Sequence, residues 1–242
     1  MGEQKMEWAS VRSRLLYEMK EGIFKDKKRL PSEAELATSM GVSRTLVRDN
    51  LALLEQEGFI TRRQGIGTMI NKHVLDVTTR VDLEMEFSEM IAEAGAAPAV
   101  KILEINTIFC DERIAEKLGI RENTPVFLVS RLITANGKPA IHCVDYLSFQ
   151  LIKDYTYQRE DLEKPLFYFL KKFCDTDVYM DLTIVRPVLT DERLAKIFNA
   201  DVGVPLLRMD EVGYNIDGQR VLYAEEYYID GVLEHTMLRK KI

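Results

Sequence analysis

The chain has 242 residues, of which 46% are hydrophobic and 30% are charged, and its formal net charge is −6. This length allows one large or two ordinary domains with buried cores. The sequence has neither an apolar run long enough to span a bilayer nor the apolar stretch of a signal peptide, so we expect a soluble, cytoplasmic protein without a membrane partner. The three cysteines and three histidines are dispersed, which excludes a disulfide framework and gives no reason to expect a metal or another cofactor.

Charge is divided unevenly along the chain. The first 75 residues carry three more basic than acidic residues, and the remainder carries nine more acidic than basic residues. A mildly basic head on an acidic body is typical of an anion-binding module attached to a second domain.

Two helices are predicted at the start of the chain. Ser32 begins the second helix, with Glu35 three residues later completing a capping box, and Gly41 ends it in a conformation that glycine adopts easily. The first helix spans residues 8–22, and its apolar face consists of Val11, Leu15, Leu16 and Met19.

A third predicted helix has a basic face opposite its apolar one. Ser43 caps this helix, and Arg44 and Arg48 are one turn apart with Thr45 beside them. The buried stripe of the helix would be Val47, Leu51 and Leu54. Two helices joined by a tight glycine turn, the second with a basic and hydroxyl-bearing N-terminal face, predict a helix-turn-helix.

Residues 59–70 predict a small hairpin with glycines at its tip. These glycines would let the backbone approach a phosphate or a groove floor, and the arginines would meet phosphates, as in the wing of a winged helix. A basic helix face alone is more often merely solvated, but the ordered set of cap, turn, basic face and hairpin favours DNA. The predicted DNA contacts are Ser32, Ser43, Arg44, Thr45, Arg48, Arg62, Arg63, Gln64, Gly65, Gly67 and Thr68.

The segment LPSEAELATSMGVSRTLVRDNLALLEQEGFITRRQGIGTMI resembles the DNA-binding segment of the GntR family of bacterial transcription regulators, over residues 8–71. The resemblance implies that Arg44, Thr45 and Arg48 meet the major groove and phosphates, and that Gly65 meets the minor groove. Two positions depart from the family pattern: Ala34 replaces a basic residue, and Asp49 lies beside an arginine. Both reduce the attraction for phosphates, so we expect weaker binding than in relatives, or more dependence on a dimer.

An internal repeat follows a polar segment that we interpret as a linker, residues 72–82, and a helix over residues 87–95. The sequences starting at Asp111 and Asp191 are alike, and each unit has a helix, two strand-like runs and a hairpin signal, at Asn136-Gly137 and Asp217-Gly218. We therefore predict an α+β body with one antiparallel sheet, pseudo-twofold symmetry and helices on one side. The predicted domains are residues 1–71 and 83–242.

The body resembles the UTRA domain, the ligand-binding module of the HutC subgroup of GntR regulators, over residues 87–239. The similar segments are FSEMIAEAGAAPAVKIL, SRLITANGKPA and VPLLRMDEVGYNIDG. The resemblance implies a fold related to chorismate lyase and a small effector that alters DNA affinity. The expected effector contacts are Glu86, Phe87, Arg131, Ile133, Cys143, Asp145, Tyr179, Leu222, Tyr223, Glu226 and Tyr228.

The effector positions differ from those of relatives that bind sugar phosphates. Such members carry Arg-x-Arg where this chain has Arg131 and Ile133, a serine where it has Glu86, and glutamates at or near Cys143 and Leu222. A carboxylate in a partly dry phosphate site is repulsive. We therefore expect a neutral or cationic effector, such as a nucleoside, an amine or an amino-acid derivative. The tyrosines are individually more often packing residues than ligand contacts.

The expected mechanism is that of a homodimer on a palindromic DNA operator, because one winged helix reads only a few base pairs. Effector binding would change the spacing of the two heads, with repression as the default and activation left open. Three alternatives remain at this stage: a lyase-like enzyme, a GntR protein with an all-helical metal-binding body, and an architectural DNA-binding protein without an effector. The chain shows no Ser-His-Asp arrangement, phosphate loop or HExxH motif that would favour an enzyme.

Overall fold

The computed structural model describes the backbone of residues 2–77, 79–83 and 85–241, and the side chains of these ranges from Val11 onward. Met1, Thr78, Glu84 and Ile242, which the predicted domains and linker include, lie outside the described residues. The chain forms two compact units: Met1–Glu84 together with His235–Ile242, and Met85–Glu234. The C-terminal segment, which we expected in the second domain, thus groups with the first.

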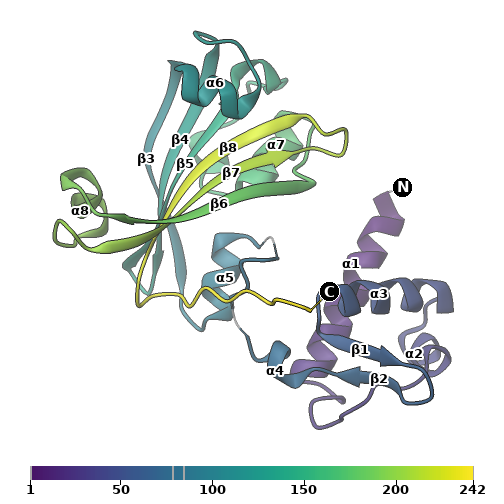
Figure 1. The fold of residues 1–242 in the computed structure, drawn as a ribbon. Coiled ribbons are helices and arrows are strands. Elements are labelled where there is room, and N and C mark those ends of the chain that lie inside the picture. The colour runs from purple at the N-terminus through teal and green to yellow at the C-terminus, as the bar shows by residue number, and fades with distance from the viewer. Residues whose placement is uncertain (1, 78, 84, 242) are drawn as a thin grey trace. The chain divides into compact units, whose positions relative to one another are not determined.

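Three helices form the main body of the first unit: α1 (Gly2–Lys20), α2 (Glu33–Met40) and α3 (Arg44–Gln56) (Figure 1). Ser32 and Glu35 form the predicted capping box at α2, and Gly41 ends that helix in the left-handed region, at φ 70°. Most of the residues expected in the core are buried in one cluster, which includes Val11, Leu15, Met19, Leu36, Val47, Leu51 and Leu54, and Leu16 is partly buried against it. The periodic apolar faces therefore placed this core correctly.

A two-stranded hairpin and a short helix complete the unit. Strands β1 (Ile60–Arg63) and β2 (Gly67–Ile70) pair antiparallel. The amide of Leu30, in the segment before α2, donates to the carbonyl oxygen of Thr68 on β2 at 2.9 Å. Helix α4 (Lys72–Leu75) lies within the segment predicted to be a linker without secondary structure. It forms there because Val74 and Leu75 are buried in the same core as the three helices.

The second unit is built on one antiparallel sheet of six strands in the order β3-β4-β5-β8-β7-β6. The first half contains β3 (Pro98–Phe109), β4 (Pro125–Ala135) and β5 (Lys138–Ser148), and the second contains β6 (Met180–Leu189), β7 (Pro205–Tyr214) and β8 (Arg220–Ile229). The two repeats meet at β5 and β8, where Cys143 is opposite Glu226. This arrangement confirms the predicted α+β class and has the symmetric order that the repeat implies, and the sheet rules out an all-helical body.

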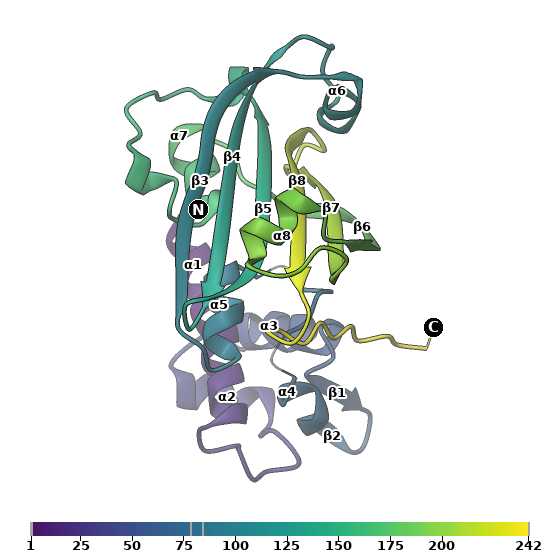
Figure 2. The ribbon, with the colours of Figure 1, turned by 90° about the vertical axis from the view of Figure 1, so that its left-hand side faces the viewer.

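The repeats also place equivalent helices on one face of the sheet. Helices α6 (Glu112–Leu118) and α8 (Glu192–Phe198) follow the outer strands, and each is capped by an aspartate, Asp111 or Asp191, that accepts a backbone N–H three residues later. Tyr223 packs in the cluster beneath α6, and Tyr227 packs beneath α8. We call the surface that these helices cover the helix-pair face (Figure 2).

The expectation that helices cover only one side of the sheet is wrong. Helix α7 (Leu166–Phe173) lies against the other face, where the ring of Phe169 stacks on Phe127 of β4 with centroids 5.8 Å apart (Figure 2). Helix α5 (Phe87–Glu93) also contacts β3 and β4, and two single-turn helices, η1 (Phe149–Leu151) and η2 (Arg159–Asp161), lie between β5 and α7. The apolar run of α7 is not part of the repeat, so the repeat pattern could not place it.

Candidate DNA-binding and effector-binding sites

Helix α3 presents a basic face to solvent. Arg44, Thr45 and Arg48 are exposed, whereas Val47 and Leu51, on the other side of the helix, are buried. Ser43 caps the helix by accepting a hydrogen bond from the amide of Leu46 at 3.1 Å. Within this unit the first turn of α3 is exposed on the side of the arginines, so this face can contact a large anionic partner.

Two of the arginines are oriented by glutamates of the same unit. Arg48 Nε lies 3.3 Å from Glu33 Oε2 at the start of α2, and Arg62 Nε lies 2.7 Å from Glu55 Oε2 on α3. These ion pairs are largely exposed, so each contributes little to stability and can be exchanged for a phosphate contact. Arg63, in contrast, is exposed with no ion pair among the described residues.

The tip of the hairpin has the backbone that its glycines require. Gly65 and Gly67 have φ of 76° and 99°, and an added Cβ at either position would meet no atom within 4 Å. Gln64 and Gly65 are exposed, and Thr68 is half-buried on β2. Backbone conformation alone therefore demands glycine here, and the open space beyond the tip is compatible with the close approach of a DNA groove.

On the face of the sheet opposite the helix-pair face, a buried ion pair joins β4 and β5. Arg131 Nη2 donates to Asp145 Oδ2 at 2.7 Å, and Arg131 Nη1 donates to the carbonyl oxygen of Lys164 at 3.2 Å. Cys143 Sγ lies 3.2 Å from Asp145 Oδ1, and burial raises the pKa of the Cys143 thiol well above its ordinary value, so the thiol donates. We call this surface the arginine face.

A small pocket opens beside Arg131. Its open space is about 10 Å³, which holds roughly one water molecule. Glu86, immediately before α5, lies at this pocket without capping the helix, and burial raises its pKa to about 7 although Arg131 lowers it in part. The lining residues are Glu86, Phe87, Ser88, Val100, Arg131, Ile133, Glu163, Lys164 and Pro165.

Strand alternation extends the arginine face to the other predicted residues. Cys143 is directly opposite Glu226 across β5 and β8, and the hydroxyl of Tyr228 donates to the Glu226 carboxylate. The ring of Tyr228 also meets Phe87 of α5 edge to face, with centroids 6.4 Å apart. Leu222 is buried on the same strand and the same face. The structure thus brings together most of the residues expected to bind an effector.

Two expected residues do not join this group. Tyr223 follows Leu222 on β8, so it points to the helix-pair face, where its ring stacks on Tyr146 with centroids 5.4 Å apart. The expectation that Tyr223 and Arg131 share a pocket is therefore incompatible with the fold. Tyr179 lies just before β6 with a side chain that is 63% exposed. No hydrogen bond or ring contact among the described residues links it to the arginine face.

Residues that the sequence analysis missed add acidic character to the arginine face. Glu211 on β7 accepts a hydrogen bond from the hydroxyl of Thr183 at 2.9 Å, and burial raises its pKa to about 7 with a further contribution from Asp181. Asp181 fits beside Gly213, since a Cβ there would lie 2.9 Å from Asp181 Oδ1. The internal repeat could have indicated Glu211, because Glu211 follows Arg131 by the same 80 residues that separate Asp111 from Asp191.

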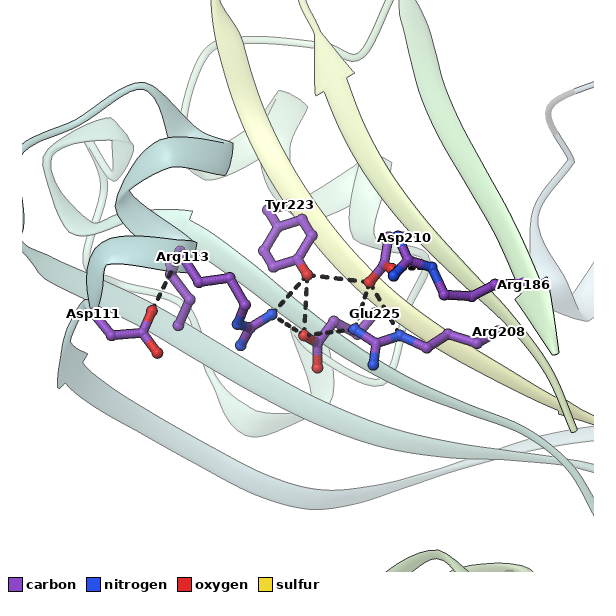
Figure 3. A network of polar contacts seen from close by, with 8 residues as sticks. Asp111, Arg113, Arg186, Arg208, Asp210, Tyr223 and Glu225 are labelled. Carbon is purple, nitrogen blue, oxygen red and sulfur yellow. Dashed lines mark hydrogen bonds and ion pairs between the residues drawn. The ribbon is translucent and has the colours of Figure 1, made fainter. Parts of the chain in front are cut away.

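The helix-pair face contains a separate network in which charges compensate one another (Figure 3). Arg113 of α6 donates to the hydroxyl of Tyr223 at 2.7 Å and pairs with Glu225. Arg208 bridges Glu225 and Asp210, with Nη2–oxygen distances of 3.2 and 2.6 Å. These contacts hold α6 against β7 and β8, so the network stabilises the fold. The arginine face therefore remains the candidate ligand site.

No three His, Cys, Asp or Glu side chains among the described residues are grouped to hold a metal ion. In the part of the chain that the structure describes, no helix has both the length and the apolar character to span a bilayer.

A winged helix with an exposed basic helix face, followed by a sheet domain with a mixed-charge pocket, is the architecture of a DNA-binding regulator with a candidate ligand site. Residues 9–70 match the bacterial regulatory proteins of the gntR family, and residues 93–230 match the UTRA domain. The chain belongs to the GntR family of transcription regulators with a UTRA domain. The lyase-like enzyme is not supported, because the family and the named relatives are transcription regulators.

Full-length relatives support this assignment. The probable fructoselysine utilization operon transcriptional repressor of Escherichia coli K12 is 25% identical over 222 residues, covering 90% of this chain and 88% of the relative. MngR of E. coli K12, the mannosyl-D-glycerate transport/metabolism system repressor, is 22% identical over 238 residues, covering 97% and 96%. The crystal structure of YydK from Bacillus subtilis has the same fold, with a TM-score of 0.78, 18% identity, and coverage of 96% and 99%.

Proposed function

We propose that this regulator is a homodimeric repressor of a palindromic operator, and that a neutral or cationic small molecule bound on the arginine face of its UTRA domain releases it from DNA. The observation that carries this proposal is the Arg131–Asp145 ion pair beside Glu86. Asp145 already neutralises the charge of Arg131, and burial raises the pKa of the neighbouring Glu86 carboxyl group to about 7. Such a site is poorly suited to a phosphate.

The electrostatics of the arginine face support an effector without a phosphate. A dianion entering the pocket would approach the carboxyl groups of Glu86 and Glu163, and the buried guanidinium of Arg131 already has Asp145 as its counterion. A cation would instead favour ionised Glu86, whose pKa of about 7 lets it adopt either form near neutral pH. A neutral polyol or amide would bond to the same groups without any charge penalty.

The names of the relatives agree with a carbohydrate-derived or amine-bearing effector. Fructoselysine, named for one relative, combines a sugar with the amino acid lysine. Mannosyl-D-glycerate, named for another, joins a sugar to a carboxylate, so it supports the carbohydrate part of this class and not a cationic group. Hydroxyl groups would bond to the Glu226 and Tyr228 pair, and an ammonium group would pair with Glu86. Both chemistries suit the arginine face better than a phosphate does.

The size of the DNA-binding face supports a dimer. The predicted DNA contacts of one unit lie on one helix face, two helix caps and one hairpin. These offer contacts to a few base pairs, and operator specificity requires more. Two copies related by a twofold axis would double these contacts on a palindromic site. In this proposal the contacts are made by the α3 face (Arg44, Thr45 and Arg48), by the helix caps (Ser32 and Ser43) and by the wing (Arg62, Arg63, Gln64, Gly65, Gly67 and Thr68).

The closed pocket favours one competing function. With room for about one water, the arginine face admits a metabolite only if α5 or the segment at Lys164 moves. A protein that never opens this pocket would be an architectural DNA-binding protein without an effector.

One experiment distinguishes these two functions. A DNA duplex is selected by the wild-type protein from a random-sequence pool, and metabolites in neutral, cationic and phosphorylated groups are screened for their effect on thermal stability and duplex affinity. We expect a neutral or cationic compound to raise the melting temperature and weaken duplex binding by about 5- to 150-fold. Glu86→Gln should reduce the effect of a cation, and Glu122→Gln, at an exposed site, should not. A response to phosphorylated compounds alone would refute the proposed effector class, and no response would favour the architectural protein.

A further inference from the structure

The last residues of the chain return to the DNA-binding unit and pair with the segment that leaves it. Thr236 forms a parallel bridge with Arg80. The amide of Val81 donates to the carbonyl oxygen of Thr236 at 2.9 Å, and the amide of Thr236 donates to that of Thr79 at 3.0 Å. The chain therefore joins its two units at two places, after residue 84 and before residue 235.

Lys240 in this C-terminal segment caps helix α3. Its Nζ donates to the carbonyl oxygens of Glu55 and Gln56 at 2.6 and 2.7 Å. The final carbonyl groups of a helix lack partners within it, and a cation there also interacts favourably with the helix dipole. Helix α3 has no basic residue in its own last turn, so Lys240, which is distant in sequence, supplies that charge.

Leu238 packs against the same helix end. It belongs to the periphery of the hydrophobic core of the unit, and its amide lies 3.3 Å from Asp82 Oδ1. Gly58, just after α3, has a φ of 86°, and a Cβ at this position would lie only 2.2 Å from Leu238 Cδ2. The absence of a side chain at Gly58 is therefore what admits the C-terminal segment.

Arg80 connects the outgoing segment to the same place. Its Nη1 donates to the carbonyl oxygen of Glu57 at 2.6 Å, and its guanidinium lies over the ring of Phe59 at 5.2 Å while pairing with Asp82. Both chain connections between the units thus end on the last turn of α3, the helix whose first turn presents Arg44 and Arg48.

We propose that Lys240 and Leu238 are positioning residues, and that the C-terminal segment, residues 235–241, is a second connection through which the UTRA domain controls the orientation of α3. Strand β8, which carries Glu226 and Tyr228, ends at Ile229, and only residues 230–234 separate it from this segment. The transmission of an effector signal rests on the proposed function, whereas the positioning of α3 does not.

The packing of the segment suits a contact that can be released. A pocket of about 320 Å³ lies beside it, lined by residues that include Glu55, Gly58, Asn71, Leu238 and Lys240. Because this pocket lies on one side of the C-terminal segment, detachment of the segment from α3 breaks few apolar contacts. Segments with few apolar contacts detach at a low cost in free energy. The two carbonyl groups that Lys240 satisfies would then be exposed to water.

The test uses the full-length protein and three matched variants. Lys240→Met removes the charge and the donors but keeps the length, Lys240→Arg keeps both, and Lys241→Met removes the same charge from the exposed neighbouring residue. Amide hydrogen exchange is measured by mass spectrometry over residues 53–59 and 79–83. We expect Lys240→Met to accelerate exchange in residues 53–59 by about three- to tenfold, and both other variants to remain within about twofold of wild type.

Duplex affinity provides the readout that a purely structural role would not change. Lys240→Met and Lys241→Met lose the same charge, so a difference between them does not come from the net charge. On the duplex selected by the wild-type protein, we expect Lys240→Met to bind about two- to tenfold more weakly than Lys241→Met. Truncation after Glu234 should produce a larger effect of the same kind. Equal effects of the two methionine variants on affinity, or unchanged exchange in Lys240→Met, would overturn the proposal.

The same measurements separate this proposal from the proposed function. Arg44→Ala should abolish most duplex binding and leave exchange at residues 53–59 unchanged. If Arg44→Ala binds the duplex as wild type does, the assignment of α3 as the DNA-contacting helix fails. The exchange comparison between Lys240→Met and Lys241→Met remains decisive for the C-terminal segment in that case.

Discussion

Arg131 on β4 and Asp145 on β5 form an ion pair with an Nη2–Oδ2 distance of 2.7 Å, and both side chains are at least 95% buried. The pair connects two adjacent strands of the first repeat, and the carboxylate also accepts a hydrogen bond from the Cys143 thiol. Because each charge is the counterion of the other, the arginine face has no free buried cation at this position.

Removal of one member of this pair should be costly. Arg131→Met leaves a buried carboxylate without a counterion, which we expect to lower the free energy of unfolding by about 3–5 kcal/mol. Urea denaturation at neutral pH measures this loss. The double variant Arg131→Met with Asp145→Asn, which buries no net charge, should recover more than half of it, and a double variant as unstable as the single one would contradict the pairing energy.

The two half-buried glutamates of the arginine face, Glu86 and Glu211, predict a pH dependence. Burial raises the pKa of Glu86 and of Glu211 from 4.5 to about 7, so the folded state binds more protons than the unfolded state between these values. This contribution to stability is fully present below about pH 4.5 and is lost as the pH rises to about 7. Allowing for solvent screening, we expect about 1–2 kcal/mol for each residue.

Glutamine variants measure this contribution. In urea denaturation between pH 5 and pH 8, Glu86→Gln and Glu211→Gln should each flatten the fall in stability. Glu122→Gln, at an exposed position of the same domain, serves as the control. A profile for either arginine-face variant that parallels that of the control would show that its carboxyl group titrates normally.

The basic face of α3 predicts a loss of DNA binding on substitution. Arg44→Ala and Arg48→Ala should each weaken binding to a selected palindromic duplex by about 1–3 kcal/mol per half-site. Each lost phosphate contact should also lower the slope of log affinity against log salt by about 1. Fluorescence anisotropy titrations at several salt concentrations give both quantities. Arg121→Ala, which removes an exposed arginine of the UTRA domain, is the matched control, and equal losses in all three variants would indicate a non-specific charge effect.

The network on the helix-pair face predicts a loss of stability without a change in duplex affinity. Glu225 accepts from Arg113, Arg208 and Tyr223, so Glu225→Gln should lower the free energy of unfolding by about 1–3 kcal/mol. Duplex affinity should stay within about twofold of wild type, because this network is on the face opposite the candidate ligand site. A large change in affinity would show that the network takes part in signalling.

Local sequence signals determined the DNA-binding unit. The capping box at Ser32 and Glu35, the left-handed Gly41 and the apolar stripe of α3 each depend on residues within about one helical turn of one another. The hairpins Asn136-Gly137 and Asp217-Gly218 are equally local, and the repeat then implied the symmetric sheet. Short-range geometry left few alternatives at these positions, so sequence alone predicted both the elements and the exposed basic face of α3.

Tertiary structure decided which distant residues meet. Strand register placed Glu211 on the arginine face and Tyr223 on the helix-pair face, a distinction that depends on a shift of a single residue. The capping of α3 by Lys240 joins residues 184 and 185 positions apart in sequence. No local pattern encodes such a contact, because the carbonyl groups at the end of α3 and the lysine that bonds to them come from opposite ends of the chain and meet only in the folded unit.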